Sequence, residues 1–281
     1  MIVDFHTHIF PSEVREQRQE YIRRDPTFAE MYGDPKAKIA TAGDLLQSME
    51  RSGVDVSVAL GFAWRDHEIC VRHNDYLLES AASSGGRIIA FCTVNMVDDR
   101  AGREIARCAL AGARGLGELR PESQGWELNG EPGEQLAALA ERLDLILLFH
   151  VTEPTEGNSY PGKEGLGLAS FYSFAVSHRQ LGIVGAHLGG GLPFFVSAEE
   201  LPAISHVYID AAARRFLYTR EAYRQILNRV SREQLILGSD YPLVSQRSEV
   251  EAVCADTADE EARELVLSGN AARLLRLAPR Q

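Results

Sequence analysis

Short apolar runs alternate with longer amphipathic ones along nearly the whole chain. The apolar runs are rich in valine, isoleucine and leucine, a composition typical of parallel strands that are buried on both faces. We therefore predict eight strands. They fall within residues 2–10, 54–62, 87–95, 112–121, 143–151, 181–189, 206–213 and 234–242.

The segments between these strands have the pattern of helices. The segment 41–53 begins at Thr41, which can cap a helix, and ends at Gly53, which can terminate one. Similar patterns predict helices at 67–85, 98–112, 134–143, 168–181, 219–230 and 260–277. Strands that alternate with helices in this way predict a (β/α)8 barrel, the TIM barrel. A doubly wound sheet also alternates, but it would more often have a glycine-rich phosphate loop after its first strand, where this chain has two histidines.

The length of 281 residues suits one barrel, and no linker separates a second domain. We therefore predict a single domain over residues 1–281. Two connections are long, namely 10–41 after the first strand and 152–166 after the fifth. Long segments that follow barrel strands often shape the mouth of the active site or cover it, and we expect that role for both.

Composition and charge limit the classes of partner. The net charge of −11 argues against a nucleic acid and against an anionic membrane surface, so we expect a small-molecule substrate. No apolar run approaches the roughly 18 residues of a membrane span, and the N-terminus does not have the pattern of a signal peptide. The four cysteines are scattered without a C-x-x-C spacing, which predicts buried, reduced thiols in a cytoplasmic protein. A homodimer is compatible with the sequence.

The first predicted strand contains two histidines, His6 and His8, in the stretch MIVDFHTHIF. Alternate residues of a strand point to the same face, so both histidines should share a face with Asp4. The opposite face would carry Val3 and Phe5. We expect the polar face to line the interior of the barrel and the apolar face to pack against helices.

Residues of metal-ligand type stand at the carboxyl ends of five predicted strands, the ends that meet at the active-site face of a barrel. They are His6, His8, Glu118, His150, His187 and Asp240. Imidazole mixed with carboxylate suits a divalent ion, with zinc our first expectation and manganese or iron as alternatives, and it leaves a position open for water. Such an ion lowers the pKa of bound water to about 7 in favourable sites. A neighbouring carboxylate can ligate the ion and also move a proton.

The same stretches resemble a known family. VDFHTH, FHV, AHLGGGLP, LGSDYP and the closing SGNAARLLRL, in this order, are similar to the amidohydrolase superfamily, and most of all to its amidohydrolase-related branch, which includes aminocarboxymuconate semialdehyde decarboxylase. The resemblance implies that His6, His8, His150 and Asp240 are metal ligands. It also implies that His187 acts as an acid/base near the metal-bound water, although in other members of the superfamily the matching histidine holds a second metal.

Glu118 departs from the decarboxylase pattern. Binuclear members of the superfamily need a bridging carboxylate on the fourth strand, and Glu118 could serve. It could also be a ligand of a single ion, which we favour. A third alternative is a structural ion pair with Arg120 or Arg114.

Candidates for substrate binding rest on position alone. Arg120 lies two residues after Glu118 on the same face and could clamp a substrate carboxylate, or it could be a solvated residue of the mouth. Tyr160 and Lys163 could reach over the site from the second long connection, or belong to its surface.

The sequence therefore predicts a metal-dependent hydrolase in which activated water attacks a small polar or carboxylate-bearing substrate, with Asp240 or His187 moving the proton. The alternative is a non-oxidative decarboxylase or hydratase of a small unsaturated carboxylic acid at the same site. Two bridged metals would instead favour phosphoester hydrolysis. A binding protein on an inactive barrel is the non-enzymatic alternative, and it should have lost ligands, whereas none is missing.

Overall fold

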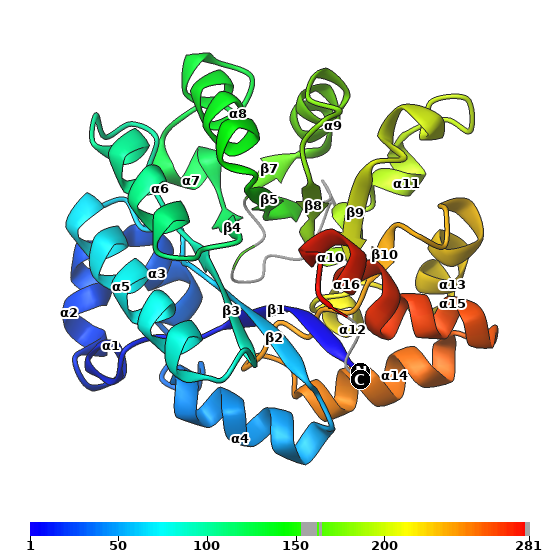
Figure 1. Cartoon of the computed structure of the whole chain (residues 1–281), viewed down its shortest axis with the longest axis horizontal. Coiled ribbons are helices and arrows are strands. Elements are labelled where there is room, and N and C mark those ends of the chain that lie inside the picture. Colours follow the sequence, from blue (N-terminus) through cyan, green and yellow to red (C-terminus); the bar gives the residue numbers. More distant parts are fainter. Residues whose placement is uncertain (153–161, 163–164, 279–281) are drawn as a thin grey trace.

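The computed structural model of the protein describes residues 1–152, 162 and 165–278, and its centre is a parallel eight-stranded barrel (Figure 1). The strands, in order around the sheet, are β1 (Val3–His8), β2 (Val56–Leu60), β3 (Ile88–Cys92), β4 (Gly115–Leu119), β5 (Ile146–Phe149), β8 (Ile183–Gly185), β9 (Val207–Asp210) and β10 (Leu235–Ile236). Backbone hydrogen bonds close the ring, since the Phe5 N–H donates to the carbonyl of Leu237 (2.8 Å) and the His8 N–H to that of Tyr241 (2.7 Å). Each strand lies within a predicted segment, so the predicted barrel is confirmed.

Helices cover the outside of the barrel (Figure 1). The outer helices are α4 (Ala42–Ser52), α5 (His67–Ser83), α6 (Ala101–Leu110), α8 (Glu131–Leu143), α9 (Leu168–Ser177), α13 (Arg220–Arg229), α14 (Gln246–Asp256), α15 (Glu260–Glu264) and α16 (Asn270–Leu275). Local chemistry sets their ends. In α4, for example, Thr41 and Asp44 form a reciprocal capping box, and Gly53 ends the helix with a φ of 67°. The predicted helices are present, the last divided by a π-helical turn at Leu265–Gly269, whereas α14 was not predicted.

The interior of the barrel is an apolar core that lies below the mouth. Its buried members are Val3, Phe5, Val56, Val58, Leu60, Phe91, Ile146, Leu148, Val184, Ala186 and Ile236, together with Ala271 and Leu275 of α16. At the start of the strands, the Arg114 guanidinium donates to the Leu275 carbonyl (2.9 Å), which ties α16 to the barrel. We call this cluster the floor of the barrel.

The first strand is irregular, and this corrects one prediction. Between the pairs Asp4↔Ser57 and Thr7↔Ala59, β1 has one residue more than β2, which is a β-bulge. Phe5 therefore packs in the floor, and Asp4 instead accepts hydrogen bonds from Gln246 of α14 (2.8 Å) and from Ser239 (2.6 Å). The expectation that Asp4 shares the inner face with the histidines, and that Val3 and Phe5 face the helices, was wrong because strict alternation fails at the bulge.

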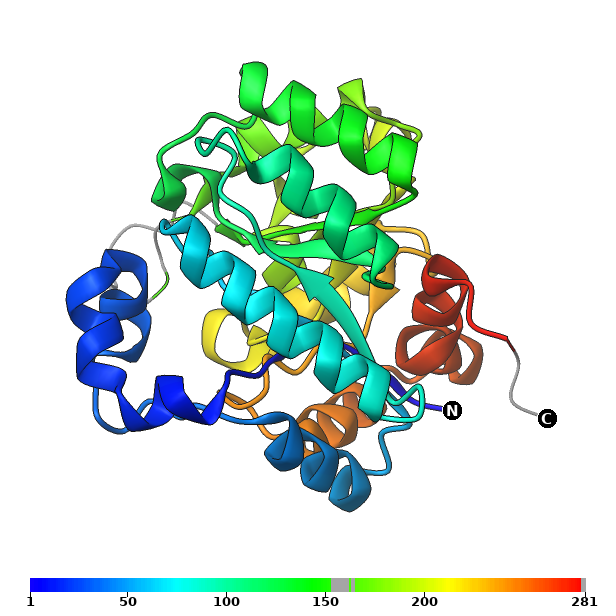
Figure 2. The same cartoon turned by 60° about the vertical axis from the view of Figure 1, so that its left-hand side comes forward.

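The first long connection folds into three short helices, α1 (Ser12–Glu16), α2 (Arg18–Arg24) and α3 (Pro26–Tyr32), which stand together on one side of the barrel (Figure 2). Asp25 caps α3 by accepting the Phe28 N–H (2.9 Å), and Pro26 fits the first helical position. The helices enclose an aromatic cluster formed by Phe10, Tyr21, Phe28, Tyr32, Phe62 and Trp64. The sequence analysis expected this connection at the mouth of the barrel and predicted no helices in it.

Shorter elements complete the structure. They are α7 (Pro121–Gln124), the parallel pair β6 (Val151–Thr152) and β7 (Leu166–Gly167), α10 (Ala186–Gly189), α11 (Leu192–Phe195), a 3₁₀ turn at Leu201–Ile204 and α12 (Arg214–Leu217). Three cysteines are buried as predicted, but Cys254 is exposed, because it lies on the outer side of the unpredicted α14. None of the helices in the described part of the chain has the length and apolar character needed to cross a bilayer.

Candidate metal centre

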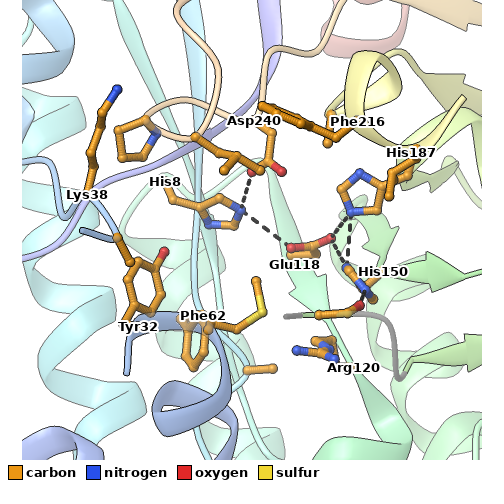
Figure 3. Close-up of a pocket in the computed structure, with 18 of the residues that line it drawn as sticks. His8, Tyr32, Lys38, Phe62, Glu118, Arg120, His150, His187, Phe216 and Asp240 are labelled. Atoms are coloured by element: carbon orange, nitrogen blue, oxygen red, sulfur yellow. Dashed lines mark hydrogen bonds and ion pairs between the residues drawn. The ribbon is translucent and has the colours of Figure 1, made fainter. Parts of the chain in front are cut away.

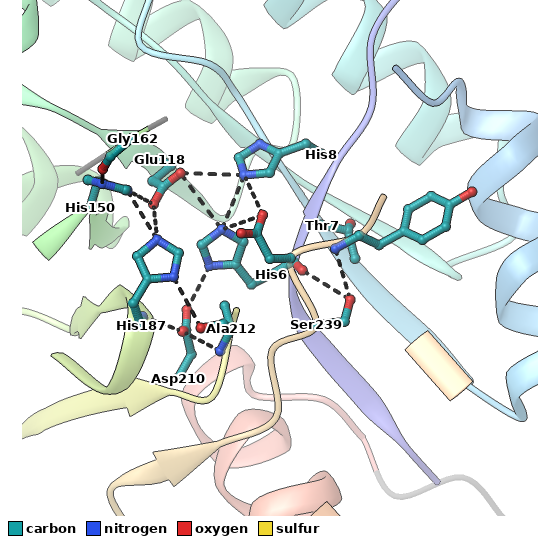
Figure 4. A network of polar contacts seen from close by, with 12 residues as sticks. His6, Thr7, His8, Glu118, His150, Gly162, His187, Asp210, Ala212 and Ser239 are labelled. Atoms are coloured by element: carbon teal, nitrogen blue, oxygen red, sulfur yellow. Dashed lines mark hydrogen bonds and ion pairs between the residues drawn. The ribbon is translucent and has the colours of Figure 1, made fainter. Parts of the chain in front are cut away.

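The barrel brings all six predicted strand-end residues together at one place. They are His6, His8, Glu118, His150, His187 and Asp240 (Figures 3 and 4). They come from the ends of β1, β4, β5, β8 and β10, because the carboxyl ends of parallel strands open on the same face. Most are buried, His6 completely, so their polar atoms need partners within the site.

The first group of donor atoms has the spacing of a metal site. His6 Nε2 lies 3.1 Å from His8 Nε2, and Asp240 Oδ1 lies 3.7 and 3.6 Å from these two nitrogens. Glu118 Oε2 adds a fourth atom, 3.7 Å from His6 Nε2 and 3.4 Å from His8 Nε2. Ligand atoms about 2.1 Å from one ion stand roughly 3.0–3.4 Å apart at octahedral or tetrahedral angles. The four donors fit a divalent ion after only small movements.

A second group lies on the other side of Glu118. Its Oε1 atom is 2.7 Å from His150 Nδ1 and 3.3 Å from His187 Nε2, and these two nitrogens are 3.1 Å apart. One carboxylate thus turns one oxygen toward each group (Figure 3). His150, which the family resemblance joins to His6, His8 and Asp240, is placed in this second group. The structural alternative for Glu118, a pair with an arginine, is not supported, because the ion-pair partners of its carboxylate among the described residues are all histidines.

Hydrogen bonds behind the site decide which ring nitrogens face inward (Figure 4). His6 Nδ1 donates to Asp210 Oδ2 (2.8 Å), and His187 Nδ1 donates to the Ala212 carbonyl (3.1 Å). His150 Nε2 donates to the Gly162 carbonyl (2.7 Å). With those protons committed, the remaining nitrogen of each ring offers a lone pair to its neighbours. Lone pairs that converge at about 3 Å repel one another unless a cation lies between them, so this arrangement favours a cation.

Asp210 is a residue of the candidate site that the sequence analysis missed. It is fully buried at the end of β9, and its Oδ1 also accepts the N–H groups of His187 (2.9 Å) and Ala212 (3.0 Å). It therefore links the histidine of β1 to the one that follows β8. The rule that selected the other residues, an ionisable side chain at a strand end, also applies to Asp210.

His187 begins an unusual turn. Residues 187–191 all have φ between 56° and 81°, so five consecutive residues are left-handed. Glycine is required at position 189 for two reasons. Its φ of 63° is left-handed, and a Cβ atom there would stand 2.7 Å from Ile209 Cγ2. The predicted strand 181–189 therefore ends at Gly185, and the turn directs the His187 ring back into the site. Asp240 also has a positive φ, 62°, and strained backbone of this kind is common at functional sites.

A pocket of about 700 Å³ opens above the donor atoms. Its wall is largely apolar, with contributions from Met31, Phe62, Phe216, Leu217 and Leu243. Arg120 lines it and is only 3% exposed, with Nη2 4.0 Å from Glu30 Oε2. Lys38 adds an exposed positive charge at the rim. Tyr160 and Lys163 lie outside the described residues.

The family assignment follows from a match over almost the entire chain. The amidohydrolase family model covers residues 3–277. The protein belongs to the amidohydrolase family. This bears out the resemblance that the histidine and glycine motifs indicated.

Solved structures with the same fold extend over the full length of this amidohydrolase family member. A 5-carboxyvanillate decarboxylase from Sphingomonas paucimobilis superposes with a TM-score of 0.79 at 19% identity, covering 99% of both chains. A 2,6-dihydroxybenzoate decarboxylase from Rhizobium gives 0.72 at 16% identity over 98% of both. The 5-carboxyvanillate decarboxylase from Novosphingobium aromaticivorans, complexed with manganese and 4-hydroxy-3-methoxy-5-nitrobenzoic acid, gives 0.79 at 16% identity, covering 99% of this chain and 96% of the other. At these identities the similarity establishes the fold.

The electrostatics of this amidohydrolase site attract positive charge. Burial lowers the pKa of His6, but the carboxylates of Asp210, Glu118 and Asp240 outweigh burial and raise it to about 10. Burial opposes ionisation of Glu118 as well, yet His150 and His6 hold the pKa of that carboxyl well below its ordinary value. Both shifts have one physical reason, namely the attraction between imidazole rings and carboxylates held together in a buried site, and a bound cation would also be attracted by these carboxylates.

Proposed function

We propose that this protein is a metal-dependent, non-oxidative decarboxylase of a small aromatic or unsaturated carboxylic acid. The observation that carries the proposal is that the donor cluster lies beneath a largely apolar pocket. The buried guanidinium of Arg120 lines the same pocket. The superposed structures support the same class of reaction, because they are decarboxylases of carboxyvanillate and dihydroxybenzoate. Hydrolysis, the first expectation from the sequence, becomes the second candidate.

The pocket suits such a substrate in shape and charge. Phe62, Met31 and Leu217 offer apolar surface to a flat hydrocarbon skeleton. Arg120 offers a planar fork of N–H donors that matches a carboxylate or another pair of oxygens. Lys38 at the rim would raise the local concentration of an anion although the chain as a whole carries a net charge of −11.

A divalent ion fits the residues present, and we propose that His6, His8, Asp240 and Glu118 Oε2 hold it. Such an ion supplies Lewis-acid polarisation of a bound oxygen. The donor types accept zinc, manganese or iron. Manganese in the Novosphingobium structure makes it the first ion to test, ahead of the zinc expected from the sequence.

The remaining chemistry is a proton transfer by side chains of this chain. The bond between the carboxylate carbon and the adjacent carbon breaks, its electron pair stays on the adjacent carbon, carbon dioxide leaves, and a proton takes its place. Asp240 and His187 are the two candidates for the proton donor, since both line the pocket beside the donor cluster. The Ala212 carbonyl holds His187 in one orientation, with Nε2 toward Glu118 Oε1 (3.3 Å), and as a proton donor His187 would carry a second proton on that atom.

Glu118 gives hydrolysis a specific basis as the second candidate. Its two oxygens face two separate groups of donors, which is the arrangement that a bridged pair of metals requires. Two metals about 3.5–4 Å apart favour hydrolysis of a carbonyl compound or a phosphoester. A non-enzymatic role has no comparable basis, because the donor set is complete. We also propose a cytoplasmic location, since no C-x-x-C pair occurs and the cysteines are free.

The test is an assay that identifies products. Protein loaded separately with manganese, zinc or ferrous iron is incubated with hydroxy- and carboxy-substituted benzoates, and with a panel of amides, lactones and phosphoesters. With at least one of the three metals, we expect one molecule of carbon dioxide to be released for each molecule of decarboxylated product. Hydrolysis products without carbon dioxide, at a ratio of two metals per chain, would replace the proposal with the second candidate.

A further inference from the structure

Tyr32 is the last residue of α3, which belongs to the first long connection, and it lines the pocket. Its ring stacks on Phe28 (centroids 4.7 Å apart, 25° between planes). It also meets Phe10 edge to face at 5.3 Å and Phe62 at 5.8 Å. Contacts on three sides fix the ring, so its hydroxyl is directed rather than free to turn away.

The hydroxyl of Tyr32 has no hydrogen-bond partner within residues 1–152, 162 and 165–278, although the residue is only 8% exposed. Tyr21, in the same aromatic cluster, points its hydroxyl outward to Glu13 (3.5 Å). A hydroxyl that lines a largely apolar pocket and has no protein partner normally bonds to water or to a ligand in that pocket. The pocket is the space that Tyr32 lines.

The charges around Tyr32 keep it a donor. Burial raises its pKa, and the carboxylates of Asp240 and Glu118 raise it further. The phenol therefore remains protonated and can donate to an oxygen, but it does not compete for the cation site. Figure 3 shows Tyr32 and Arg120 on different sides of the pocket.

We infer that the Tyr32 hydroxyl donates a hydrogen bond to an oxygen substituent of the substrate, and that it thereby selects acids with such a substituent over unsubstituted ones. The inference rests on the proposed function, since it assumes that the pocket takes a small carboxylic acid. It assigns the first long connection a role in specificity. Arg120 and the donor cluster would engage the carboxylate, and Tyr32 would engage the second oxygen.

Equilibrium binding tests this without relying on turnover. Benzoate and the three monohydroxybenzoates are titrated by calorimetry into metal-loaded wild type, Tyr32→Phe and Tyr21→Phe. We expect wild type to bind at least one hydroxybenzoate about tenfold more tightly than benzoate, the effect of a single hydrogen bond. Tyr32→Phe should lose this margin and keep its affinity for benzoate. Tyr21→Phe, which removes a hydroxyl from the same cluster but outside the pocket, should keep both.

The outcomes separate the two proposals. If wild type shows no margin, or if Tyr32→Phe retains it, the role of Tyr32 is refuted while carboxylate binding stands. If none of the four acids binds to wild type, the proposed function fails and the inference fails with it. Equal melting temperatures and metal contents of the three proteins confirm that the variants differ only in the pocket.

Discussion

Replacing Asp210 by asparagine should weaken metal binding through a residue that touches no metal. Asp210 Oδ1 accepts two backbone N–H groups, and its Oδ2 accepts the proton of His6 Nδ1. The carboxamide of asparagine can keep only one oxygen. If that oxygen stays with the two N–H groups, an NH₂ group faces His6 Nδ1, and donor meets donor.

His6 can then avoid the conflict only by moving its proton to Nε2, the atom that faces His8, Glu118 and Asp240. A protonated Nε2 cannot ligate an ion. Retaining the productive tautomer instead sacrifices one hydrogen bond to a charged acceptor, which is worth about 1.5–3 kcal/mol. This corresponds to roughly a 10- to 100-fold loss of metal affinity, the range found for partners behind metal ligands.

The assay is competition between the protein and a chelator of known affinity at fixed pH. Asp25→Asn is the matched control, because Asp25 is also a buried carboxylate that accepts two backbone N–H groups, those of Phe28 and Arg65, but it contacts no histidine. Urea unfolding of the metal-free proteins measures any general loss of stability. Unchanged metal affinity in Asp210→Asn, or an equal loss in Asp25→Asn, would refute the assignment of Asp210 as the residue that orients His6.

Three further predictions address the donor cluster and the pH dependence of stability. Glu118→Gln should lower metal content, from two ions to one or fewer if Glu118 bridges and from one to a fraction if it ligates a single ion; an unchanged ratio by mass spectrometry would remove Glu118 from the ligand set. Asp240→Asn should retain part of the metal but lose turnover by about 10² or more, as expected for loss of an acid/base group, and near wild-type turnover would transfer that role to His187. Burial lowers the pKa of His73 from 6.5 to about 4. The unfolded chain therefore takes up a proton at a higher pH than the folded chain does. The contribution of His73 to the free energy of unfolding is complete above pH 6.5 and is lost as the pH falls toward 4. Urea unfolding should show a loss of about 2 kcal/mol at pH 5 relative to pH 7.5 that is absent in His73→Gln, and parallel pH profiles of the two proteins would contradict it.

The sequence predicted the barrel and most of the candidate site for one reason: parallel strands place their carboxyl ends together. That geometry does not depend on loop detail, so His6, Glu118 and Asp240 could be grouped although they lie far apart in the chain. Asp210 obeys the same rule and was overlooked at the end of the seventh predicted strand. A systematic application of the rule to every strand end would have included it.

Other features could not be predicted because they depend on local backbone. Strict alternation placed Asp4 beside the histidines, and only the register of β1 against β2 reveals the extra residue. The glycines that follow His187 in AHLGGGLP do not by themselves reveal that the backbone forms a left-handed turn. Tyr32 reaches the pocket through the packing of α3 on an aromatic cluster, and no spacing in the sequence indicates that contact.

The bulge in β1 also determines how anything enters or leaves the site. Because Phe5 and His6 both point inward, the apolar floor begins one residue below the donor cluster, and an ion held there would face apolar side chains on that side. Exchange would then proceed through the pocket that we propose for the substrate. Metal release becomes a kinetic quantity that an occupant of the pocket controls, so a bound acid would slow the stripping of the ion by a chelator even where it adds little to the equilibrium affinity.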